Sequence, residues 1–217
     1  MHYTTLPMRS WIWKILIISI VVACALAPVA CGANQNTSSR DPSGKEGSTL
    51  ATTVPEDSAG VQEGAGAVAA LSGVQKADQA AAEWQSDAEL YAIASLKPQV
   101  DAEGRAPAWL YTYVSSSRKA VVSVSVSGGK VADTPEQALP DEQIEDISNH
   151  TLPPPARLLD STEAVKKSGK FLDTLKSEPG LDASAGLDSF STGKPVWIFS
   201  TAKGDKRVEE RVSATGS

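Results

Sequence analysis

Residues 195–217, PVWIFSTAKGDKRVEERVSATGS, decide the fold because their pattern occurs twice in the chain. They predict two strands around a turn. Residues 107–130, PAWLYTYVSSSRKAVVSVSVSGGK, have the same layout. At an offset of 88 residues (197 − 109), Trp109 aligns with Trp197 and Tyr111 with Phe199, and no gap is needed. The chain has only 5 tryptophans, so the match predicts an internal duplication.

Strict alternation of apolar and polar residues predicts a sheet with one face packed in the core and one face exposed to solvent. In residues 107–130, Trp109, Tyr111 and Tyr113 share one side of a strand, and residues 115–119 form the turn. On the second strand, valines at 122, 124 and 126 alternate with serines at 123, 125 and 127. The aromatic rows, which include Trp197 and Phe199, are interpreted as core beneath helices. The alternative is a binding platform on an open sheet face.

Each predicted hairpin follows a predicted helix. An apolar stripe at three- and four-residue steps predicts a helix over residues 72–96, with a capping box at Ser72. A second capping box at Asp160 opens another helix, whose buried side is formed by Ala164, Val165, Gly169, Leu172 and Leu175. Between the two units lies a proline-rich connector, in which residues 140–150 form a short acidic helix with Ile144 and Ile147 inward.

The sequence thus predicts an α+β fold of two helix–strand–strand repeats. Two hairpins side by side make a four-stranded antiparallel sheet, with the helices packed on one face. The repeats cover residues 72–132 and 159–217, and the connector covers residues 133–158.

The N-terminal residues 1–30 have the layout of a secretory signal. Arg9 and Lys14 precede an apolar run. Both cysteines end this segment after small residues, as VVAC at Cys24 and PVAC at Cys31. This resembles the lipobox of bacterial lipoproteins, in which the cysteine is lipidated, for instance with palmitate. Cys31 is preferred as the lipid-attachment residue because the apolar run then has full length. The alternatives are lipidation at Cys24, an ordinary cleaved signal and a transmembrane anchor.

Residues 31–71 are rich in Gly, Ser, Thr, Ala and Asn and contain no aromatic residue. Such a stretch cannot bury enough apolar area to offset its ordering entropy, so it is predicted to be a flexible, disordered tether. The chain after cleavage has 18 basic and 26 acidic residues, a net charge of −8. This charge disfavours nucleic acid as a partner.

The tandem units resemble the PepSY-like repeat of secreted and membrane-anchored bacterial proteins. That repeat is a helix followed by a hairpin whose last strand often ends in Thr-Gly, as it does here at Thr215 and Gly216. The first copy departs from it, with SGG at residues 127–129. The resemblance implies no catalytic residues, and it implies binding, peptidase inhibition or regulation at the cell envelope.

The residues give few signals of chemistry. After cleavage His150 is the only histidine, and it is interpreted as a solvated loop residue. Ser191 and Lys194 have the Ser-x-x-Lys spacing of penicillin-recognising enzymes without their other motifs, and are interpreted as turn formers. Acids at 141, 142, 145 and 146 would suit a weak calcium site but are more typical of wet surface. No catalytic, metal or cofactor residue is predicted.

These observations predict a non-enzymatic lipoprotein of the cell envelope. It would be held at the membrane by its lipid on the extracytoplasmic side, and it would bind a protein or peptide. The alternatives are an extracytoplasmic hydrolase that uses carboxylates, and an accessory subunit of an envelope assembly.

Overall fold

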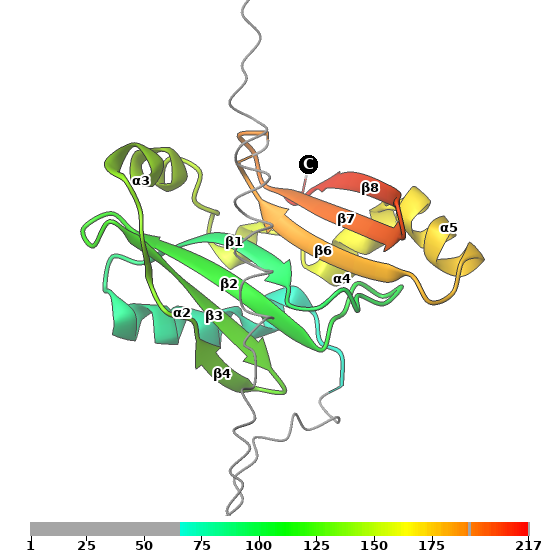
Figure 1. Cartoon of the computed structure of the whole chain (residues 1–217), viewed down its shortest axis with the longest axis horizontal. Coiled ribbons are helices and arrows are strands. Elements are labelled where there is room, and N and C mark those ends of the chain that lie inside the picture. The colour runs from blue at the N-terminus through cyan, green and yellow to red at the C-terminus, as the bar shows by residue number, and fades with distance from the viewer. Residues whose placement is uncertain (1–65, 191, 217) are drawn as a thin grey trace, which may run out of the picture. The chain divides into compact units, whose positions relative to one another are not determined.

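The computed structural model describes residues 66–190 and 192–216 (Figure 1). The predicted signal, nearly all of the predicted tether, Cys24 and Cys31 lie outside these residues. The described residues form an α+β fold with one eight-stranded sheet, in which every pair of named strands is antiparallel. The α+β class and the antiparallel sheet are therefore confirmed.

The sheet has the strand order β4-β3-β2-β1-β6-β7-β8, and β5 also pairs with β3. Its strands are β1 (Glu89–Ser95), β2 (Ala108–Ser115), β3 (Ala120–Ser127), β4 (Lys130–Asp133), β5 (Gln137–Ala138), β6 (Asp182–Asp188), β7 (Val196–Lys203) and β8 (Lys206–Ser213). The two predicted hairpins are β2–β3 and β7–β8. The prediction of a four-stranded sheet is wrong, because β1 and β6 lie between the hairpins.

The registers of the two hairpins differ by two residues. Trp109 pairs with Val126, and Trp197 pairs with Val212. The first strands are thus 88 residues apart (197 − 109), whereas the second strands are 86 apart (212 − 126). The ungapped alignment is wrong beyond the turn, because the β7–β8 turn is two residues shorter. An even shift preserves which face each side chain occupies.

The helical segments are short. They are the 3-10 helix η1 (Ala70–Gly73), α2 (Val74–Trp84), α3 (Asp141–Ser148), η2 (Pro155–Arg157), α4 (Ser161–Ala164), η3 (Val165–Lys167) and α5 (Gly169–Ser177). In Figure 1, α2, α4 and α5 lie behind the sheet. The contacts agree, since α2 packs on β2 and β3, and α5 packs on β7 and β8. The short acidic helix is confirmed as α3, with Ile144 and Ile147 buried.

The first predicted helix is too long and misplaced at its start. It was expected to run to residue 96, but α2 ends at Trp84 and residues 89–95 form β1. Ser72 does not cap α2, because its hydroxyl donates to Ala69 O (2.6 Å). The fold also begins before residue 72, since Val68 pairs with Ala106 and Ala70 is fully buried. The short apolar run in β1 fits helix and strand periods equally well, which explains the error.

The second predicted helix is interrupted. Asp160 caps its start by accepting from Ser161 N (2.6 Å), as predicted. The helix then tightens into η3 and breaks at Ser168, and α5 continues from Gly169. Phe171 is the fully buried residue of α5, while Leu172 and Leu175 only line the core.

The aromatic rows form the core, as predicted. Trp109, Tyr111, Trp197 and Phe199 are each 0% exposed, so the aromatic-platform alternative is wrong. The two tryptophan rings meet edge to face with centroids 6.1 Å apart. Each indole N–H donates to a backbone carbonyl just before its helix: Trp109 to Val68 O and Trp197 to Leu159 O, both at 2.8 Å. The indole hydrogen bonds thus connect each hairpin to the chain segment that leads into its helix.

Candidate binding surface

Among the residues that the structure describes, the face of the sheet opposite the tryptophans is left open over most of its width. We call it the open face. The strand registers place on it Ala92, Ala94, Leu110, Thr112, Ser123, Ser125, Ser184, Gly186, Ile198, Ser200, Ala202, Arg207, Glu209 and Arg211. Most of these side chains are half-buried or exposed. They make a mixed apolar and polar surface rather than a second core.

One row of neighbours crosses the open face at its middle. Leu110 pairs with Ala94, Ala94 with Gly186, and Gly186 with Ile198. The two larger aliphatic side chains therefore stand on either side of the two smallest residues. Neighbouring strands lie about 4.8 Å apart, so β2 and β7 lie about 14 Å apart. The centre of the open face therefore carries small side chains between two larger aliphatic ones.

Beside the central row, hydroxyls pair across strands. Thr112 Oγ1 lies 3.1 Å from Ser123 Oγ, and Ser184 Oγ lies 2.8 Å from Ser200 Oγ. These hydroxyls already have partners, yet each oxygen has further bonding capacity for a ligand. The face thus combines modest apolar area with adaptable hydrogen-bonding groups, which suits contact with a protein.

Within the described part of the chain, α3 covers one corner of the open face. Its residues Ile144 and Ile147 are buried with Val114 and Tyr91, and these four lie outside the main core cluster. Burial and then the carboxylates of Asp188 and Asp146 raise the pKa of Tyr91. The phenol therefore stays neutral at physiological pH. Within residues 66–190 and 192–216, no helix lies over β7 and β8 on this face.

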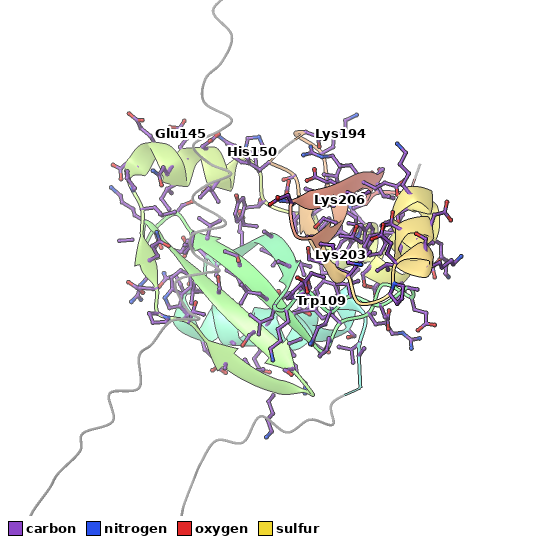
Figure 2. All side chains as sticks on the ribbon, turned by 45° about the vertical axis from the view of Figure 1, so that its right-hand side comes forward. Trp109, Glu145, His150, Lys194, Lys203 and Lys206 are labelled. Atoms are coloured by element: carbon purple, nitrogen blue, oxygen red, sulfur yellow. The ribbon has the colours of Figure 1, made fainter. Side chains whose placement is uncertain are left out.

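The charges at the two ends of the sheet, counted over both of its faces, are unevenly distributed. Helix α3 carries four acids and no basic residue, whereas residues 194–213 carry five basic residues and three acids. Figure 2 shows Glu145 on α3, and Lys194, Lys203 and Lys206 beside β7 and β8. On β8, Arg207 and Arg211 both pair with Glu209, at 3.5 and 3.1 Å. One end of the sheet is therefore acidic and the other weakly basic.

Two grooves flank the sheet, the first on the side of the open face and the second on the side of the tryptophans and α2. The first, of about 310 Å³, lies between the β2–β3 turn and α3 and is crossed by the Lys119–Asp141 ion pair (2.9 Å). The second, of about 370 Å³, lies between α2, β1 and the three prolines at 153–155. In it the Tyr113 hydroxyl donates to Asp78 (2.7 Å). Burial and then this bond raise the pKa of Tyr113, so it remains a neutral donor.

The other candidate residues are not brought together. His150 is half-buried, with Nδ1 2.7 Å from Asp146 O and its ring 5.2 Å from that of Phe190, so it is less solvated than predicted. Lys194 is exposed in a turn where Thr192 Oγ1 donates to Lys194 O (2.7 Å), and Ser191 lies outside the described residues. The described residues hold no group of three or more His, Cys, Asp or Glu suited to a metal.

Comparisons with protein families, curated proteins and solved structures found no match to the chain. Among the described residues, no helix is both long and apolar enough to cross a membrane.

Proposed function

We propose that the chain is a lipid-anchored, non-enzymatic protein- or peptide-binding module on the extracytoplasmic side of the bacterial membrane. The observation that carries the binding role is the open face, which leaves β6, β7 and β8 uncovered on one side among the described residues. Monomeric proteins usually cover or charge such surfaces, so a broad face that mixes apolar and polar side chains favours a partner.

Internal symmetry supports the proposal of two PepSY-like repeats. The tryptophans make equivalent indole bonds, and Leu110 and Ile198 occupy equivalent open-face positions. Ile93 pairs with Tyr111, and Ala185 pairs with Phe199. These two equivalent residues of β1 and β6 lie 92 positions apart in the chain (185 − 93). At the same offset Ala94 corresponds to Gly186, and these two residues pair with each other. A twofold axis through that pair would relate two helix–strand–strand–strand units.

The N-terminal pattern supports the anchor and hence the location. Labelled palmitate should enter the wild-type chain and the Cys24→Ser variant but not Cys31→Ser. Labelling that is lost only in Cys24→Ser would move the anchor to that residue. Labelling of none of the three would contradict the lipid anchor.

The binding role is tested in intact cells with a photo-cross-linking amino acid at Ile198 on the open face. We expect a specific protein adduct from this position. The matched control is Lys176, an exposed residue of α5 on the other side of the sheet. Equal adducts from both positions, or none from either, would contradict binding at the open face.

A further inference from the structure

We infer that a second copy of this chain covers the open face, in a twofold pair in which α3 of each copy lies against β7 and β8 of the other. This inference rests on the proposed function, because it names the protein that the open face binds.

The first argument is the distribution of cover over the open face. In residues 66–190 and 192–216, α3 stands over the β1–β2 corner through Ile144 and Ile147, and nothing stands over β7 and β8. Each copy thus presents a raised corner under α3 and a bare end at β7 and β8. A twofold rotation places the raised corner of each copy over the bare end of the other, so one rotation covers both bare ends.

The second argument is charge. Glu142 and Glu145 on α3 are exposed, and neither forms an ion pair with another described residue. On β8, Arg207 and Arg211 share the single carboxylate of Glu209, which leaves one positive charge in excess. A uniformly acidic or basic partner would be attracted at one end of the face and repelled at the other. A second copy in the twofold arrangement meets opposite charge at both ends.

The same asymmetry extends through the described chain. Residues 66–152 carry 6 basic and 12 acidic residues, a net charge of 6 − 12 = −6, and residues 153–216 carry 10 and 9, a net charge of 10 − 9 = +1. A pairing that sets the first half of one copy against the second half of the other therefore avoids contact between the two acidic halves.

The test uses the full-length chain in membranes, with the photo-cross-linker at Ile198 and two different epitope tags on co-expressed copies. The expected adduct contains both tags. The double reversal Glu142→Lys/Glu145→Lys should lower the yield of this adduct about tenfold, and so should Arg207→Glu/Arg211→Glu, because each places like charges together. Co-expression of the two reversed variants should restore the adduct. The control Lys170→Glu/Lys176→Glu, which reverses two charges on α5, should leave the yield unchanged.

The outcomes separate this inference from the proposed function. An adduct that holds one copy and a different protein would overturn the second copy and leave the binding role standing. The arrangement would be overturned if the yield of the two-tag adduct were unchanged in both charge-reversal variants. It would also be overturned if co-expression of the two variants did not restore that yield. No adduct at all would overturn both. Thermal unfolding of each variant checks that a lost adduct does not reflect a lost fold.

Discussion

At the scale of single residues, Gly73 illustrates how tightly the tryptophan face is packed. It ends η1 directly against Tyr111, whose hydroxyl donates to Ala70 O (2.6 Å). A Cβ at position 73 would overlap that hydroxyl oxygen. The close approach of backbone and phenol therefore requires glycine here.

We predict that Gly73→Ala lowers the free energy of unfolding by about 1–3 kcal/mol, because the added methyl displaces Tyr111 and breaks its bond to Ala70. Chemical denaturation measures this change. The control is Gly169→Ala in α5, where a Cβ would meet nothing within 4 Å. That variant should be neutral or slightly stabilising, since alanine favours helix. Equal effects at the two positions would contradict the close packing.

Asp87 is a second residue with a defined role. Its carboxylate accepts from Ser115 Oγ (2.7 Å) and from Ser117 N (2.9 Å), and so joins the segment between α2 and β1 to the β2–β3 turn. These hydrogen bonds lower the pKa of Asp87 from 3.8 to about 2, and the bond from Ser115 has the largest effect. A depressed pKa means that folding favours the ionised form. The stabilisation is therefore complete above pH 4 and is lost as the pH falls through about 2.

We predict that Asp87→Asn flattens the dependence of stability on pH between about 4 and 2, because the variant has no proton to bind there. Thermal unfolding followed across this range measures the slope. Asp173→Asn, at an exposed position of α5, serves as the control and should retain the wild-type slope. If Asp87→Asn kept the wild-type slope of stability against pH, the ionisation of Asp87 would not contribute to stability in this range.

At the scale of elements, α5 depends on a neighbouring strand for its cap. Its N-cap residue Ser168 makes no side-chain cap bond, and its hydroxyl donates instead to Val165 O. Glu210 of β8 caps the helix instead, because its carboxylate accepts a hydrogen bond from Phe171 N in the first turn (3.0 Å). A carboxylate also suits the positive end of the helix dipole. The helix start is thus fixed by a strand that lies 39 residues later in the chain.

We predict that Glu210→Ala lowers the free energy of unfolding by about 0.5–2 kcal/mol, the range for loss of a helix cap. Amide hydrogen exchange should localise the effect to residues 169–173. The matched control is Glu209→Ala, the neighbouring residue on the opposite face of β8, which contacts arginines instead. If exchange in α5 accelerates equally in both variants, Glu210 is not its cap.

The elements also show which local signals were sufficient. Alternation identified the strands of both hairpins, because their valines and aromatic residues fit one buried face. Strand β6, with the sequence DASAGLD, was missed because its small residues have low strand propensity. Strand β1 was missed because its short apolar run fits the helix and strand periods alike, and a bulge between Leu90 and Ala92 removes the regular alternation that would have favoured a strand.

At the scale of the whole molecule, the pairing of β1 with β6 determines the sheet. It joins Ile93 to Leu187, residues that are 94 positions apart (187 − 93), and no local period encodes such a contact. For the same reason the sequence could indicate a wet face from Ser123 and Ser125 but not its extent. Which strands a helix covers is decided by tertiary packing, so the bare end of the open face at β7 and β8 emerged only from the structure.

The central claim is that the open face serves binding and contributes little to stability. Ala94 lies at its centre and is half-buried. The most direct measurement combines Ala94→Arg with the Ile198 cross-link in cells and with chemical denaturation. We predict that this variant loses the adduct while its free energy of unfolding stays within about 0.5 kcal/mol of the wild type, as for surface substitutions. A stable variant that forms the adduct at wild-type yield would contradict the claim.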